Sequence, residues 1–127
     1  MLVKNKIGVI DSQDALIGNR AYDLASLVDD VRFKTSTSFK NEIYNFFIKR
    51  QKNMNIQNFK NDFEILSILR NLKIIGIFTR LAKRDGKKNY LKLIPYTWEL
   101  INIRINENDA FKELKSLLIR NFGKHIK

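Results

Sequence analysis

The chain contains very few of the residues that form turns and end helices. Its 127 residues include one proline, Pro95, and five glycines. Since these two residue types are the strongest local breakers of regular structure, their scarcity favours long helices over many short strands. Apolar residues make up 44% of the chain, enough for one buried core, and domains commonly hold about 100–150 residues. We therefore expect a mainly α protein with a single core.

Apolar residues at helical spacing predict five helices. The first is expected over residues 21–33, and the second after the capping residues of 35–38. The third should run from about residue 58 to Asp85-Gly86, where the glycine can take the left-handed conformation that ends helices. A fourth is expected over 90–103, with Pro95 in its first turns, and a fifth over 109–122, closed by Gly123. Trp98 and the phenylalanines fall at helical spacing and are expected in the core.

The start of the chain has a different pattern. Two short apolar runs, Leu2-Val3 and residues 7–10, flank Lys4-Asn5-Lys6, which predicts a tight hairpin of two small strands. Two strands alone are marginally stable in water. We therefore treat residues 1–127 as one partial domain, with a hairpin and polar loop over about 1–20 and a helical body over 21–127.

Several classes of protein are excluded or disfavoured by composition. The absence of cysteine excludes disulfides, thiolate metal sites and a cysteine nucleophile. No phosphate-binding glycine loop is present, and the single histidine, His125, lies in a basic tail where we expect it to be solvated. Apolar runs are far shorter than the roughly 20 residues of a membrane-spanning helix, and no signal peptide is evident. We expect a cytoplasmic protein with no membrane partner.

The net charge of +11 is unevenly distributed. Residues 1–47 carry equal numbers of basic and acidic side chains, so the whole excess lies after residue 47. Such a chain could bind nucleic acid by releasing counterions. The alternative is compositional, because lysine, asparagine and isoleucine are all abundant, as AT-rich codons would produce. Both interpretations stay open, and weak, nonspecific binding of nucleic acid is compatible with either.

An acidic loop follows the predicted hairpin. Asp11 comes directly after the apolar run that ends at Ile10, and Asp14 lies three residues further on. A carboxylate at the end of a strand can hold Mg²⁺, which prefers rigidly placed oxygen ligands. Turn aspartates also bond to their own backbone, so spacing alone leaves a purely structural role open.

Two blocks of the sequence resemble a known family. The first contains Ile7-Gly8-Val9-Ile10-Asp11-Ser12-Gln13-Asp14-Ala15, Gly18, Ala21-Tyr22-Asp23-Leu24-Ala25-Ser26-Leu27 and Asp30-Val31-Arg32; the second contains Arg70-Asn71-Leu72-Lys73, Gly76-Ile77-Phe78, Arg80-Leu81-Ala82, Arg84-Asp85-Gly86-Lys87, Tyr90-Leu91 and Pro95-Tyr96-Thr97-Trp98. Together they resemble the aminoglycoside phosphotransferase-like kinases. The most similar branch is the bacterial sugar kinases of cell-wall recycling, which phosphorylate N-acetylmuramate or N-acetylglucosamine at the anomeric carbon. The resemblance spans about residues 7–104.

The resemblance implies roles for particular carboxylates. In such kinases Asp11 would chelate the Mg²⁺ that bridges the phosphates of ATP. The spacing of Asp14, three residues further on, places it near enough to share or brace that site or to contact the substrate. Asp23 matches the aspartate that braces the catalytic loop by hydrogen bonding. Asp30 and Arg32, further along the same predicted helix, could meet the sugar, although a solvated helix face would explain them equally well. The implied fold is the helical C-terminal lobe of a protein-kinase-like protein.

The chain also departs from the family pattern. Ser12 stands where the family has phenylalanine, and Asn19 replaces a proline. The catalytic loop, with its base aspartate and metal-binding asparagine, and the nucleotide lobe would precede Met1. We therefore expect a truncated or split phosphotransferase fragment, inactive alone and binding neither Mg²⁺ nor ATP by itself. Its partner would be a separate chain carrying the nucleotide lobe, or a second copy of itself. The alternative is a basic helical module that binds nucleic acid or an acidic protein.

Overall fold

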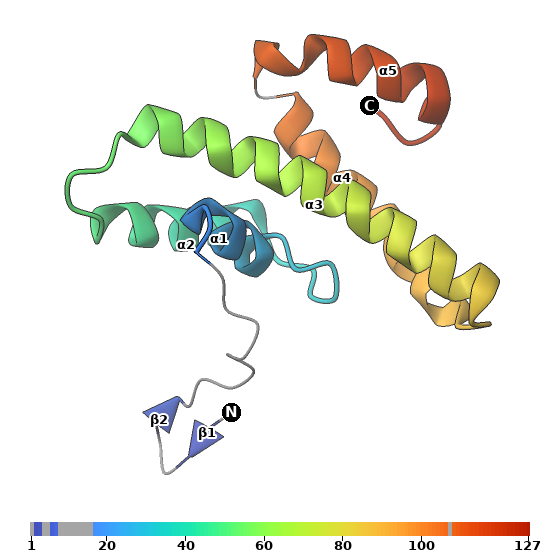
Figure 1. Ribbon diagram of the computed structural model, residues 1–127, viewed down its shortest axis with the longest axis horizontal. Helices are drawn as coiled ribbons and strands as arrows, with labels where there is room; N and C mark the ends of the chain where they lie inside the picture. The colour runs from blue at the N-terminus through green and yellow to red at the C-terminus, as the bar shows by residue number, and fades with distance from the viewer. Residues whose placement is uncertain (1, 4–5, 8–16, 107) are drawn as a thin grey trace.

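The computed structural model describes residues 2–3, 6–7, 17–106 and 108–127, and most of them are helical (Figure 1). The elements are β1 (Leu2–Val3), β2 (Lys6–Ile7), α1 (Arg20–Val28), α2 (Thr37–Lys49), α3 (Ile56–Arg84), the 3₁₀ helix η1 (Lys88–Leu93), α4 (Ile94–Ile105), the 3₁₀ helix η2 (Asp109–Phe111) and α5 (Lys112–Phe122). The expectation of a mainly α protein is confirmed. β1 and β2 pair antiparallel with Leu2 opposite Ile7; residues 8–10, where the second strand was also expected, lie outside the described residues.

The long helix α3 is the central element of the molecule. Figure 1 shows it running past α1 and α2 at its N-terminal half and beside α4 at its C-terminal half. Asn55 caps its start by accepting a hydrogen bond from the Asn58 backbone nitrogen at 2.9 Å. At its end Gly86 has a φ of 69°, so the predicted left-handed glycine is confirmed. The length of α3 agrees with the unbroken helical spacing of apolar residues in this region.

The apolar core consists of three clusters arranged along α3. The first joins α1, α2 and the start of α3, and includes Ala21, Leu24, Ala25, Val28, Phe59 and Phe63. The second lies between α3 and α4 and is centred on Val31, Phe78 and Leu100. The third joins α3, α4, α5 and the C-terminal tail through Ile68, Trp98, Ile101, Ile105, Phe111, Leu118 and Ile126. Because each cluster includes residues of α3, that helix connects the whole core.

Three predicted boundaries were wrong. The first helix ends at Val28 and not near residue 33, because Asp29 leaves the helical conformation with a ψ of 42° and its side chain turns into the interior. The fourth begins at Ile94, since residues 88–93 form the 3₁₀ helix η1 and Pro95, which lacks an N–H, suits the first turn of α4. Likewise η2 occupies residues 109–111, and α5 starts only at Lys112.

Within the described residues, no helix is both long enough and apolar enough to cross a bilayer.

Candidate functional site

Asp11, predicted to hold a metal, and Asp14, predicted to brace that site or to contact the substrate, lie outside the described residues. Across the described part of the chain, no three histidine, cysteine, aspartate or glutamate side chains come together in a group that could hold a metal ion. The metal assignment of Asp11 and Asp14 therefore stays a prediction.

Asp23 lies in the first turn of α1, and its side chain is exposed. A carboxylate at this position interacts favourably with the positive end of the helix dipole. Asn19 fixes the start of the same helix: its side-chain oxygen accepts from the Ala21 backbone nitrogen at 2.9 Å, and its amide donates to Asp62 on α3 at 2.6 Å. The N-terminus of α1 is thus held against α3 while Asp23 remains open to a further contact.

Asp30 and Arg32 come together in the turn after α1. Arg32 donates from Nε at 3.0 Å and from Nη2 at 2.8 Å to the two oxygens of the Asp30 carboxylate, and its backbone nitrogen adds a third bond at 2.9 Å. These hydrogen bonds lower the pKa of Asp30, and the same pairing raises the pKa of Arg32. Their expected position on a helix was wrong, since α1 ends before them. They form a partly exposed ion pair on a turn.

A buried charged cluster lies directly beneath that turn. The side chain of Asp29 is 1% exposed. Its carboxylate accepts from Ser67 Oγ at 2.5 Å and lies 3.3 Å from Arg104 Nη2 and 3.5 Å from Lys40 Nζ. Lys40 Nζ also donates to the Val28 carbonyl at 2.6 Å, at the C-terminal end of α1. These contacts join α1, α2, α3 and α4, and they fix the backbone that carries Asp30 and Arg32.

Sequence reasoning missed this cluster, although signals for it were present. Asp29 continues the series Ala21, Ala25 at a spacing of four, so it falls on the buried face of α1. Arg104 likewise follows Leu100 and Ile101 on the buried face of α4. A charged residue that falls within an apolar stripe predicts a buried ion pair, because an unpaired buried charge is very costly. The partner residue cannot be inferred from the stripe itself.

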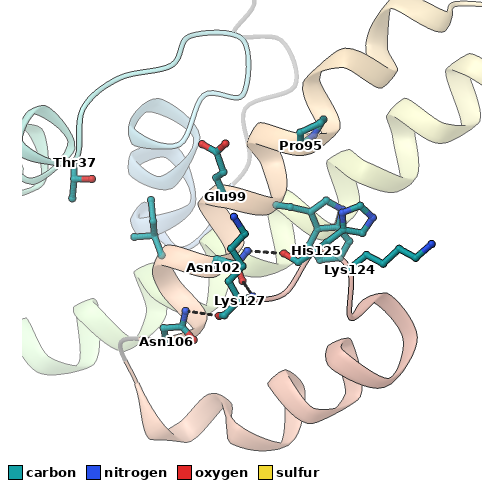
Figure 2. Close-up of a pocket in the computed structure, with 10 residues that line it drawn as sticks. Thr37, Pro95, Glu99, Asn102, Asn106, Lys124, His125 and Lys127 are labelled. Atoms are coloured by element: carbon teal, nitrogen blue, oxygen red, sulfur yellow. Dashed lines mark hydrogen bonds between the residues drawn. The ribbon is translucent and has the colours of Figure 1, made fainter.

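The C-terminal tail folds back onto α4 beside a cavity (Figure 2). Asn102 donates to the His125 carbonyl at 2.7 Å and accepts from the Lys127 backbone nitrogen at 3.0 Å, while Asn106 donates to the Lys127 carbonyl at 3.0 Å. The His125 ring stacks on Trp98 with centroids 5.2 Å apart and the planes inclined by 4°. The cavity has a volume of about 630 Å³. His125 is exposed, as expected, but it also covers a core tryptophan.

The chain was compared with protein families, curated proteins and solved structures. No family model matches it, and no solved structure is a significant match. Four curated proteins do match, all N-acetylmuramate/N-acetylglucosamine kinases. The kinase of Neisseria meningitidis is 35% identical over 101 residues, 75% of this chain; that of Caulobacter vibrioides is 30% identical over 111 residues, 87% of this chain. The kinase of Pseudomonas aeruginosa is 30% identical over 124 residues, 93% of this chain.

These matches extend over most of this chain but over a minor part of each relative. The chain spans 30% of the Neisseria and Caulobacter kinases and 37% of the Pseudomonas aeruginosa kinase. It is thus similar to part of these sugar kinases, and the resemblance seen in its motifs is confirmed.

Proposed function

From this similarity we propose that the chain forms the helical C-terminal lobe of an ATP-dependent sugar phosphotransferase and is inactive by itself. The observation that carries the proposal is the match of most of this chain to about a third of each of four sugar kinases. Phosphoryl transfer needs a bound nucleotide, a metal ion and a base that orients the acceptor hydroxyl. The remaining part of the kinase, on the same or a separate polypeptide, would supply the nucleotide lobe and that base.

Asp11 and Asp14 are the residues we propose for the metal. Carboxylate oxygens are the ligands that Mg²⁺ prefers, so the donor type fits the ion. A Mg²⁺ ion held there would supply positive charge to offset the negative charge that develops during phosphoryl transfer. The exposed Asp23 carboxylate, at the start of α1, would accept hydrogen bonds from the catalytic loop of the complementary part.

Asp30 and Arg32 are proposed to contact the acceptor sugar. The ion pair leaves the Arg32 side chain 71% exposed, so its guanidinium can still donate to a ligand hydroxyl. The Asp29 cluster supports this role, because it fixes the backbone of the turn from below. A turn held in one conformation can present its polar side chains to a sugar at little entropic cost.

Exposed apolar side chains around α1 mark the surface that the rest of the kinase would cover. Ile17 precedes the helix and is fully exposed, Leu27 on α1 is 65% exposed, and Phe33 in the following turn is 69% exposed. These three side chains precede, lie on and follow α1, and exposed apolar side chains that form one patch are typical of an interaction surface. We propose that the complementary part of the kinase packs against them.

A chimeric kinase tests the proposal. In this chimera, residues 1–127 would replace the segment of the Neisseria meningitidis kinase that matches this chain. The assay would measure phosphorylation of N-acetylglucosamine in the presence of ATP and Mg²⁺. We expect turnover by the chimera and none by the isolated chain. Asp11→Asn in the chimera should lower kcat at least about a hundredfold, because the metal would lose a charged ligand. Asp109→Asn, at an exposed residue of η2, is the control and should leave turnover unchanged.

Two results would contradict the proposal. One is turnover by the isolated chain that Asp11→Asn abolishes, which would show that no complementary part is needed. The other is a chimera that is folded by circular dichroism but phosphorylates no sugar.

A concentration of basic residues favours a second candidate function, binding of nucleic acid. Eight lysines and arginines and a single carboxylate, Asp85, lie within residues 70–92, over the C-terminal half of α3 and the η1 helix. Arg84 pairs with Asp85, with Nε at 2.6 Å from the carboxylate. The excess of positive charge at this end of α3 would attract phosphates without regard to base sequence.

A further inference from the structure

One side of the long helix α3 faces away from the core. Residues three, four or seven positions apart share a side of a helix, and the residues that α3 buries occupy the opposite side. The outer α3 face is defined by six exposed residues on this side: Ile65, Leu69, Lys73, Gly76, Arg80 and Lys83. None of them belongs to α1 or to the turn that follows it, so this face is separate from the residues considered above.

The outer α3 face has an apolar half and a basic half. Ile65 and Leu69 lie one turn apart with exposed fractions of 43% and 54%. Large apolar side chains exposed next to one another are typical of an interaction surface. The C-terminal half of the face is basic, and residues 65–84 contain no aspartate or glutamate. The face therefore offers apolar contact area at one end and positive charge at the other.

Gly76 lies between the two halves, inside a helix of 29 residues. Glycine in the middle of a helix is destabilising relative to alanine. A Cβ at this position would have no atom within 4 Å, so packing within the described chain does not require a glycine here. What the glycine supplies is a low point on the outer α3 face. The axes of two packed helices approach as closely as the side chains at their contact allow, so a second helix could cross α3 closely at Gly76.

These features together define the partner. We propose that the outer α3 face docks an acidic amphipathic helix of another protein. The apolar stripe of that helix would cover Ile65 and Leu69, and its carboxylates would face the basic half of α3. From Ile65 to Lys83 the face is about 27 Å long at 1.5 Å per residue, so a partner helix of about 18 residues covers it. This docking does not depend on phosphoryl transfer.

Two other occupants fit the face less well. A second copy of the chain would place basic half on basic half if the two α3 helices ran parallel, and basic half on Ile65 and Leu69 if they ran antiparallel. Neither arrangement brings opposite charges together. Nucleic acid would contact the basic half through its phosphates but would leave the apolar half and the low point at Gly76 unused.

Two acidic peptides of equal composition test the docking on the full chain. Both would have about 20 residues of leucine, alanine and glutamate; one places its leucines along one side of a helix, and the other has them scrambled around it. Calorimetric titration at about 0.15 M salt gives each Kd. We expect the amphipathic peptide to bind at least about tenfold more tightly, since only it can cover Ile65 and Leu69 while its carboxylates face the basic half.

Three results of these titrations would overturn the proposal. Equal affinity of the two peptides would show attraction by charge alone, and no saturable binding of either would show that the face docks no such helix. Tighter binding of a DNA duplex than of the amphipathic peptide would make nucleic acid the occupant.

Matched variants locate the contact. Leu69→Ser removes apolar area, and Gly76→Gln adds a neutral side chain at the crossing point and improves helix propensity. Both positions are exposed, so circular dichroism should show an unchanged fold, and either variant serves if the other fails to fold. Each should raise the Kd of the amphipathic peptide about tenfold and leave that of the scrambled peptide unchanged.

Leu117→Ser on α5 is the control, because Leu117 is 52% exposed, close to the 54% of Leu69, and lies outside the outer α3 face. It should leave both Kd values unchanged. Unchanged affinity in Leu69→Ser and Gly76→Gln, or an equal loss in Leu117→Ser, would place the peptide elsewhere. A wild-type dimer in sedimentation that Leu69→Ser converts to a monomer would make a second copy the occupant and overturn the proposal.

Discussion

Asp29 links residues that are far apart in the sequence. Its carboxylate contacts Lys40, Ser67 and Arg104, and its carbonyl accepts from Arg70 at 3.2 Å. Taking ions out of water is costly, and only close partners and hydrogen bonds offset that cost. This cluster therefore specifies how α1, α2, α3 and α4 meet, and removing one member leaves the others without compensation.

We predict that Asp29→Ala lowers the free energy of unfolding by about 3–5 kcal/mol, because Lys40 and Arg104 would remain buried without their anion. Denaturation in guanidinium chloride, followed by circular dichroism, gives the value. The neighbouring Asp30→Ala is the matched control: its partly exposed pair with Arg32 should contribute no more than about 1 kcal/mol. Equal effects of the two substitutions would show that the cluster does not stabilise the fold.

The ion pair of the turn predicts a pH dependence. Hydrogen bonds from Arg32 hold the pKa of Asp30 below its usual value in the folded state. A carboxylate with a lowered pKa stabilises the fold above its unfolded pKa of about 3.9, and this contribution is lost as the pH falls through the folded value. NMR titration of the Asp30 carboxyl should show the low pKa in the wild type and a return toward the ordinary value in Arg32→Gln. An unchanged pKa in that variant would mean that Arg32 is not the cause.

At the scale of elements, α3 organises the helical core and α4 positions the tail. α3 contributes residues to each apolar cluster, whereas the tail is attached through the two asparagines of α4 and through Ile126. The tail also covers Trp98, the single tryptophan, which is 4% exposed. Trp98 fluorescence therefore reports whether the tail is attached.

We predict that Asn102→Ala releases the tail. The substitution removes the hydrogen bond that Asn102 donates to the His125 carbonyl and the one that it accepts from the Lys127 backbone nitrogen. The expected result is a shift of Trp98 emission to longer wavelength and stronger quenching by acrylamide. The free energy that holds the tail on α4 should fall by the contribution of these two hydrogen bonds, about 1 kcal/mol each. Asn121→Ala is the control, since the Asn121 amide donates to the Leu117 carbonyl within α5. Unchanged Trp98 emission in Asn102→Ala would show that other contacts hold the tail.

At the scale of the whole molecule, the net charge of +11 gives a direct expectation for polyanions. Contacts to phosphates alone release counterions and carry no base specificity. We predict weak binding of double-stranded DNA that is independent of its sequence and falls steeply between 50 and 200 mM salt, as phosphate contacts do. Gel-shift titration at several salt concentrations checks this. Sequence-selective binding that persists at about 150 mM salt would favour the nucleic-acid function over the phosphotransferase.

Local sequence patterns were enough to predict the helical class, the long helix α3 with its left-handed Gly86, and the resemblance to sugar kinases. Helical spacing, capping residues and motif order are local patterns, so they can be read along the chain. The end of α1 at Val28 and the contacts of Asp29 with Lys40 and Arg104 became visible in the folded chain alone. The same holds for the Tyr44 hydroxyl, Glu64 Oε1 and the Asn71 amide, which have no hydrogen-bond partner within the described part of the chain. Such pairings join residues dozens of positions apart, and they depend on how α2, α3 and α4 pack, which no local pattern records.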